Sequence, residues 1–281
     1  MRSTPPSALK WNGTSRLVST LAAMAAAYRV GLASALAAWP VLLGRAIFYG
    51  VCLMVLVAFW DKVGAQRLAG TLAVRLPPGG LGVYIGVTEW VTLSVPAIQL
   101  RLEDDIRSGA LEPHLLRPKP YLAQTLAGEF GAMTARLAML GAAGLLLLAI
   151  SGRPWPAGFG LIYVGVLGAI GAGIGVLLYA LVGLMAFWMR RVLPALLIMQ
   201  KLMFLLGGLF APITFYPGWL HDLAAASPFA AHLAFAGQAM LTPSLADFGH
   251  ALAAQAIWGG LLVLAAALIW RAGLAKVLKG G

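Results

Sequence analysis

Charged residues gather in one stretch of this chain, from Arg101 to Pro120. Eight of its 20 residues are Asp, Glu, Lys or Arg, although the whole 281-residue chain holds only 29 such residues. Long apolar runs flank the stretch on both sides, and a charge at the midplane of a bilayer costs several kcal/mol. We therefore expect the stretch to lie in water between two membrane spans, where it can contact another molecule.

The order of residues within this stretch suits a short amphipathic element that docks into a groove of a partner protein. An acidic triplet favours a helix N-terminus, a glycine can end that helix, leucines form an apolar ridge and a proline stops it. In chain order these residues are Glu103, Asp104, Asp105, Gly109, Leu111, Leu115, Leu116 and Pro118. On physical grounds alone, a solvated loop with a surface helix fits equally well.

Four ionisable residues fall within or beside the apolar runs: Glu89, Glu129, Arg136 and Lys201. Such groups usually face a bundle interior or a water-filled path and pair with one another. Glu129 and Arg136 are seven residues apart, so they share a helix face two turns apart, which requires a third group or water between them. Structural pairing is the simpler interpretation, and a proton relay is the alternative.

Motifs of enzymes and of nucleotide-binding proteins are missing from the chain. No Lys is followed by Ser or Thr, which excludes a G-x-x-x-x-G-K-[ST] loop, and H-E-x-x-H, C-x-x-C and G-x-S-x-G do not occur. The single cysteine, Cys52, excludes a disulfide framework, and the four histidines are irregularly spaced. We therefore predict no catalytic site, no metal site and no cofactor in this chain.

The composition is that of a polytopic membrane protein. Hydrophobic residues make up 61% of the chain and charged residues 10%, whereas a soluble protein has roughly a quarter of its residues charged. The net charge of +11 could indicate nucleic-acid binding. In a membrane protein, excess Lys and Arg more often mark the cytoplasmic flanks, so we predict no nucleic-acid partner.

Six membrane spans account for the apolar runs, since a span needs ~20 mostly apolar residues. The predicted spans are Pro40–Trp60, Leu81–Leu100, Phe130–Ile150, Pro154–Met189, Leu202–Leu220 and Ala251–Trp270. With both termini in the cytoplasm, the inside segments carry 14 Lys and Arg residues and the outside segments four. This asymmetry agrees with the positive-inside rule and places residues 101–120 on the cytoplasmic side.

The two ends of the predicted bundle carry further elements. Residues 1–38 are interpreted as a cytoplasmic tail and an interfacial helix, in preference to a signal peptide. Residues 210–250 form an external segment, in which Pro212, Pro217 and Pro228 break the helix and Trp219 suits the membrane interface. We predict that this segment re-enters the membrane before the last span, and a plain external loop is the alternative.

Glycines at small-xxx-small spacing occur within two predicted spans. Gly82 precedes Gly86, and Gly171 precedes Gly175. This spacing lets helix backbones approach closely. Packing within the chain is the favoured interpretation, with a pliable span or a dimer seam as the alternatives.

The charged stretch resembles the signature loop of the permease subunits of type-2 ABC exporters, an I-R-S-G-x-L-x-x-x-L-L-R-P pattern after the second span. The matching residues are Ile106, Arg107, Ser108, Gly109, Leu111, Leu115, Leu116, Arg117 and Pro118. The likeness extends to Glu129 at the start of the third span and to the prolines of the external segment. Glu112 and Pro113 depart from the pattern, which often has Asp and an aromatic residue there.

This resemblance implies an all-α permease domain of six transmembrane helices over residues 1–281, with both termini in the cytoplasm, in the inner membrane. Its partners would be the bilayer, a separate ABC ATPase that binds ATP and Mg, and a second permease of the same or a related sequence. It further implies export of a small or amphipathic substrate by a subunit that is not itself an enzyme.

Roles for individual residues follow from the resemblance. The residues implied in ATPase coupling are Glu103, Asp104, Asp105, Ile106, Arg107, Ser108, Gly109, Leu111, Leu115, Leu116, Arg117 and Pro118. Those implied in the outer gate are Pro212, Pro217, Trp219 and Pro228. The alternative function is that of a secondary transporter driven by an ion gradient, which is disfavoured because no paired half-sequence repeat is evident.

Overall fold

The protein folds into a bundle of helices. The computed structural model describes residues 13–63, 79–111, 113, 120–152, 158–209 and 211–279. In chain order the elements are α1 (Gly13–Ala37), α2 (Trp39–Val63), α4 (Gly80–Ser94), α5 (Ile98–Arg107), α7 (Tyr121–Ile150), α8 (Gly160–Leu184), η1 (Met185–Phe187), α9 (Leu193–Leu206), η2 (Ile213–Phe215), α10 (Gly218–Ala225), α11 (Pro228–His232), α12 (Ala234–Leu241) and α13 (Leu245–Leu278). Strands are absent from these residues, which confirms the predicted all-α class.

Six helices of the described residues are long and apolar enough to cross a membrane, which confirms the polytopic class and the predicted number. They are Val18–Ala37, Trp39–Trp60, Gly80–Arg107, Tyr121–Ile150, Gly160–Phe187 and Leu245–Leu278. The set differs from the predicted one, because it includes α1 and excludes α9. The 14 residues of α9 are about 21 Å long at 1.5 Å per residue, less than a bilayer core of about 30 Å.

The predicted fifth span, Leu202–Leu220, is wrong. The helix there is α9, which ends at Leu206 and is followed by Gly207 and Gly208. Gly208 has a φ of +68°, a left-handed conformation that ends a helix and that glycine adopts without strain. The apolar residues beyond it therefore do not continue the span.

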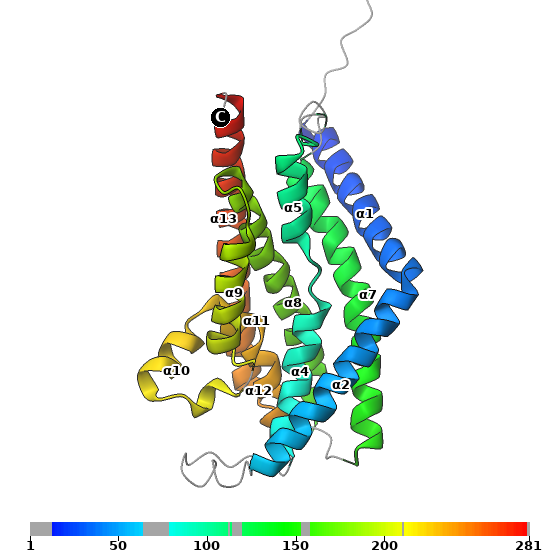
Figure 1. The fold of residues 1–281 in the computed structure, drawn as a ribbon, viewed down its shortest axis with the longest axis vertical. Helices are drawn as coiled ribbons and strands as arrows, with labels where there is room; N and C mark the ends of the chain where they lie inside the picture. Colours follow the sequence, from blue (N-terminus) through cyan, green and yellow to red (C-terminus); the bar gives the residue numbers. More distant parts are fainter. Residues whose placement is uncertain are drawn as a thin grey trace, which may run out of the picture.

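The predicted second span, Leu81–Leu100, is divided into two helices. Pro96 has no backbone N–H, and a proline disfavours helical backbone at the residue before it. Accordingly α4 ends at Ser94, Val95 is extended, and α5 begins at Ile98. In Figure 1, α5 continues beyond α4 toward the end of the molecule that also holds the C-terminus.

Helix α1 lies along the first half of α7 through direct backbone contact. A Cβ added at Gly31 would lie 1.9 Å from the carbonyl oxygen of Gly128, and one added at Gly131 would lie 2.0 Å from that of Tyr28. Tyr28 also donates a hydrogen bond of 2.9 Å to Thr134. In Figure 1, α1 and α2 follow one another along one side of the bundle. Helix α1 is one of the six helices long and apolar enough to cross a membrane, so the predicted interfacial position is an alternative to crossing and stays a prediction.

Helix α8 lies in the middle of the bundle and contacts α13, α5, α11, α12, α4, α7 and α9. The predicted close packing at its glycines is present within the chain. A Cβ added at Gly171 would lie 2.3 Å from the carbonyl oxygen of His232 in α11, and one at Gly175 would lie 2.5 Å from the His232 ring. Elements α10 and α12 lie at the opposite end of the molecule from α5 (Figure 1).

Candidate functional site

Helix α5 is the first element of the charged stretch, and its sequence makes it amphipathic. Ile98 and Leu102, four residues apart, share one face and are fully buried. Asp104 and Arg107 lie on the exposed face. The buried face of α5 rests on the end of α8, where a Cβ at Gly183 would lie 2.8 Å from the Cα of Gln99. The close approach at Gly183 therefore allows the backbone of α5 to pack directly against α8.

Side-chain bonds attach α5 to α7 as well. Arg101 Nη1 lies 3.2 Å from Glu129 Oε1, and Arg101 Nε lies 3.9 Å from Asp105 Oδ2. The hydroxyl of Tyr121, the first residue of α7, donates a hydrogen bond to Asp105. Two acidic residues, one from each helix, thus share Arg101.

A second ionic cluster joins α5 to the turn between η1 and α9. Glu103 Oε1 lies 3.8 Å from Arg107 Nη1 and 4.0 Å from Arg191 Nη1. The Glu103 side chain is only 11% exposed, whereas that of Arg191 is 73% exposed. The buried carboxylate is therefore compensated by two solvated guanidinium groups, and this turn lies beside α5.

The residues predicted for ATPase coupling differ in how far their side chains are exposed. Glu103 and Leu111 are buried, and Asp105, Ile106 and Gly109 are partly buried. Those that remain exposed are Asp104, Arg107 and Ser108. Gly109 has a φ of +75° and forms the turn after α5, as predicted. The predicted start of this helix is wrong, because α5 begins at Ile98 and the acidic triplet lies in its second half. The predicted residues Leu115, Leu116, Arg117 and Pro118 lie outside the described residues.

Two arginines satisfy the carbonyl groups that the break at Pro96 leaves free. The last carbonyls of a helix have no partner within it, and the C-terminal end of its dipole attracts cations. Arg45 of α2 donates to the oxygen of Leu93 at 3.3 Å, and Arg136 of α7 donates to that of Val95 at 3.1 Å. This arrangement was not predicted from the sequence. A proline within a predicted span, together with arginines in two other predicted spans, could have indicated that the arginines bind the carbonyl groups at the break.

The four intramembrane polar residues do not form one cluster. Glu129 binds Arg101 and Arg136 binds the backbone, which favours structural pairing over the predicted alternative of a relay. Glu89 lies on α4 and forms no ion pair within the described part of the chain. Lys201 lies exposed on α9.

The residues predicted for an outer gate mark the joints of the external segment. Pro212 is buried and precedes η2, and Pro217 precedes α10, where Trp219 is 71% exposed. Pro228 is the first residue of α11, and the hydroxyl of Ser227 before it accepts a hydrogen bond from the backbone N–H of Ala230 at 3.3 Å. Each of the three prolines thus lies at the start of a short helix of this segment.

Two tyrosines hold the part of this segment that follows α9. The Tyr84 hydroxyl of α4 donates to the oxygen of Gly208 at 2.8 Å, and that of Tyr216 donates to the oxygen of Leu205 at 2.6 Å. Burial raises the pKa of Tyr216, so its hydroxyl keeps its proton and remains a donor. These bonds satisfy carbonyls at and beyond the end of α9.

The helices α11 and α12 are the part of the external segment that enters the bundle. His232 and Gln255 fix α11 there, and both are buried at 1% exposure. His232 Nδ1 donates to the oxygen of Gly171 at 2.8 Å, and Gln255 Nε2 donates to the oxygens of Leu167 and Ala231, each at 2.9 Å. Neither His232, one of the irregularly spaced histidines, nor Gln255 was singled out from the sequence.

A family model described as ABC-2 family transporter protein matches residues 81–279. The match covers more than half of the chain and includes α4, α5, the external segment and α13. The chain belongs to the ABC-2 transporter family. A comparison with curated proteins gives no match.

Membership in the ABC-2 family confirms the resemblance to a type-2 ABC permease that the stretch after the second span predicts. The protein is the membrane component of an ABC transporter and crosses the membrane several times. Membrane components of this family transport and are not themselves catalytic, and the family works in general with an ABC ATPase.

Proposed function

We propose that the protein is the permease subunit of an ABC exporter, driven by ATP hydrolysis on a separate ATPase subunit that docks on α5 and the residues after it. Two permeases, identical or related, pair in the cytoplasmic membrane, with both termini in the cytoplasm. The substrate is small or amphipathic. ATP and Mg bind to the ATPase partner, and the permease itself holds no cofactor.

The attachment of α5 carries this proposal. Its exposed face offers Asp104, Arg107 and Ser108 to a partner, while its buried face is seated on α8 at Gly183. Arg101 joins it to α7, and Glu103 joins it to the turn before α9. A displacement of α5 would therefore act on α7, α8 and the turn before α9 together. The helix break at Pro96 allows α5 to move relative to α4.

The external segment would close the outer mouth of the transporter. Helix α11 enters the bundle beside α8, the helix that also supports α5. One helix thus contacts both the proposed docking element and the proposed gate. This arrangement supports a coupling of the two ends through α8.

Co-purification tests the docking assignment. The Leu115→Asp and Leu116→Asp double variant places two charges on the predicted apolar ridge. We expect it to lose the ATPase from the purified complex, because burying an unpaired carboxylate in an interface is strongly unfavourable. The measurement is the ratio of ATPase to permease after affinity purification of the tagged permease from cells expressing both.

The matched control is Leu223→Asp, a leucine that is 54% exposed on α10, far from α5 in the fold. It should leave the ratio unchanged. If the double variant folds and still binds the ATPase at unchanged stoichiometry, the docking assignment is wrong. Loss of transport with a protonophore, but not on depletion of ATP, would instead favour the gradient-driven alternative.

A further inference from the structure

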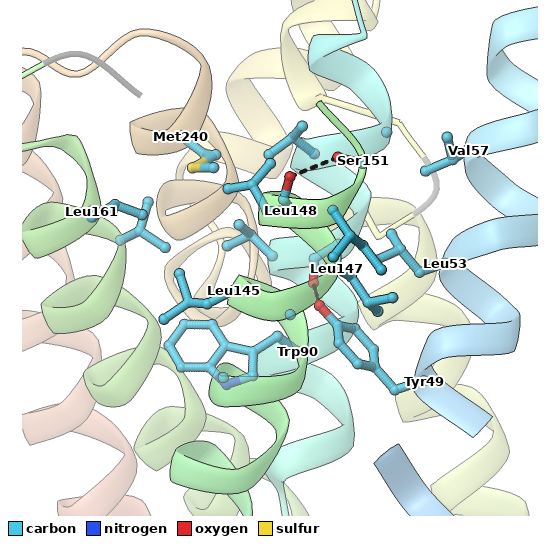
Figure 2. Close-up of a pocket in the computed structure, with 18 of the residues that line it drawn as sticks. Tyr49, Leu53, Val57, Trp90, Leu145, Leu147, Leu148, Ser151, Leu161 and Met240 are labelled. Carbon is cyan, nitrogen blue, oxygen red and sulfur yellow. Dashed lines mark hydrogen bonds between the residues drawn. The ribbon is translucent and has the colours of Figure 1, made fainter. Parts of the chain in front are cut away.

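An apolar cavity of about 460 Å³ lies between α2, α4, α7 and α8 (Figure 2). Tyr49 and Trp90 lie at one end of it and Ser151 at the other, with Leu145 and Leu147 between them and with Leu161 and Met240 of α12 at one side (Figure 2). Small-molecule sites have volumes of roughly 300–1,000 Å³, so the space is large enough for a ligand.

The cavity offers a ligand few free polar groups. The Tyr49 hydroxyl donates to the oxygen of Gly86 at 2.9 Å, and the Trp90 indole N–H donates to that of Leu137 at 2.9 Å. The Ser151 hydroxyl donates to the oxygen of Leu148 at 2.8 Å. Because these donors are already used within the protein, a polar ligand would lose its bonds to water without replacement. The chemistry of the walls selects an apolar ligand.

Several glycines form the walls and keep the cavity open. Gly165 of α8 lines it, and a Cβ added there would meet no atom within 4 Å. At Gly141 and Gly144 of α7, an added Cβ would instead approach Trp90 and Tyr49. The absence of side chains at these positions thus creates the space and seats the two aromatic rings.

The mouth of the cavity opens on the outer surface of the bundle. Among its lining residues, Met54 is 61% exposed and Ile150 is 72% exposed, while Val87 and Val164 behind them are buried. These residues belong to helices that are long and apolar enough to cross a membrane. The mouth therefore faces hydrocarbon chains of the bilayer and not water.

From this geometry we propose that the cavity binds a single alkyl chain of an amphipathic molecule, which enters sideways from the membrane. At about 30 Å³ for each water-sized group, the space admits on the order of ten or more methylene groups. The chain belongs either to a membrane lipid or to an exported amphiphile, since both present the same chemistry. A second copy of this protein packed over Met54 and Ile150 would cover the mouth without filling the space behind it.

The affinity of the cavity for an alkyl chain is set by the difference in free energy between the chain in the cavity and the chain in the bilayer. A chain that moves from lipid into this cavity gains no hydrophobic free energy, because lipid tails are as apolar as the walls. Binding therefore depends on the fit of the chain to the walls, and it should be saturable and sensitive to added volume. A larger side chain at Gly165 reduces the volume of the cavity and therefore tests this dependence directly.

Photolabelling of the full-length protein in lipid nanodiscs tests the proposal. One arm uses a phosphatidylcholine with a diazirine at the end of one acyl chain, and the other a single-chain fatty acid with the same group. Labelled peptides are identified by mass spectrometry. We expect saturable labelling of the buried residues Val87 and Val164 in at least one arm, and the labelled arm identifies the source of the chain.

A matched pair of variants controls the result. Gly165→Leu should reduce labelling of Val87 and Val164 several-fold, because the leucine side chain takes up space in the cavity that Gly165 lines. Gly259→Leu changes a glycine of α13 that also has open space around it and does not line the cavity, and it should leave the labelling unchanged. Exposed residues of α13 such as Ile257 and Leu264 serve as the reference for ordinary lipid contact.

Three outcomes would overturn the proposal: labelling restricted to exposed residues, labelling that Gly165→Leu does not reduce, and crosslinks between two protein copies at the cavity without any lipid label there. The wild-type pattern is informative even if Gly165→Leu fails to fold. No ATPase is present in this experiment, so its result is independent of the docking proposal.

Discussion

The two ends of the molecule are held by different kinds of bonds. Both α5 and α11 are seated closely on α8, but the side-chain bonds of α5 to its other neighbours are formed by charged groups, and Arg101, its link to Glu129 of α7, is 55% exposed. Helix α11 is attached through His232 and Gln255, which are uncharged hydrogen-bonding groups at 1% exposure, and through glycine contacts with α8. Exposed ion pairs are worth roughly 0–1 kcal/mol, whereas a buried polar group that loses its partner costs about 1–3 kcal/mol.

This difference suits different tasks. An element that must respond to a partner protein benefits from bonds that break and re-form at little cost in water. An element lodged among helices has no water to replace its bonds, so it keeps one arrangement or moves as a unit. We therefore expect substitution of the exposed ionic side chains of α5 to cost less stability than substitution of His232 or Gln255.

The largest effect is expected from Gly171→Ala. The added methyl group would lie 2.3 Å from the carbonyl oxygen of His232, so α11 must shift away from α8. Overpacking of this kind costs about 3 kcal/mol, at the upper end of the usual range. Thermal unfolding of the purified protein should show a clear loss of stability.

Gly173→Ala is the control on the same helix. Its nearest neighbour would be a Phe130 ring carbon at 3.4 Å, an ordinary contact. Alanine is also the better helix former by about 1 kcal/mol, so this variant should be neutral or slightly stabilising. Equal stability of the two variants would show that α11 is not tightly seated on α8.

A smaller effect is expected from Arg136→Met, which tests the joint between the two ends. The variant keeps the apolar stem and removes the donor to Val95. Loss of a charged hydrogen bond to a carbonyl costs about 2 kcal/mol, and thermal unfolding measures it. Arg136→Lys, which keeps a donor, should recover part of the loss. An Arg136→Met protein as stable as wild type would mean that other groups satisfy the break.

The sequence predicts the class of this fold well because hydrophobic length and charge asymmetry are strong signals in membranes. It predicts the bounds less well where backbone chemistry overrides hydropathy. Apolar residues continue past Leu206, so only the Gly207–Gly208 pair could have shown that α9 ends there. Pro96 likewise divides a span whose hydropathy is continuous.

The contacts of the candidate site were not predictable from the sequence. The charged stretch after the second span predicts a docking face, and both this role and the leucine ridge at Leu115 and Leu116 stay predictions. The pairing of Glu129 with Arg101 could not be predicted, because it depends on how α5 lies against α7. His232 carried no signal of burial, since a histidine between prolines is typical of a surface loop.

The smallest effect is expected from the pair Arg101 and Glu129, and a double-mutant cycle with Arg101→Gln and Glu129→Gln measures it. The cycle isolates the pair from the cost of leaving Glu129 without its partner. Because the Arg101 side chain is more than half exposed, the coupling should be below about 1 kcal/mol and should decrease further in high salt, where the screening length becomes shorter. A coupling above about 2 kcal/mol that is insensitive to salt, by the same scale, would mean that α5 is held as rigidly as α11. In that case the two ends would not differ in the way their bonds indicate, and the element that responds to the partner would have to be sought among the residues after Gly109.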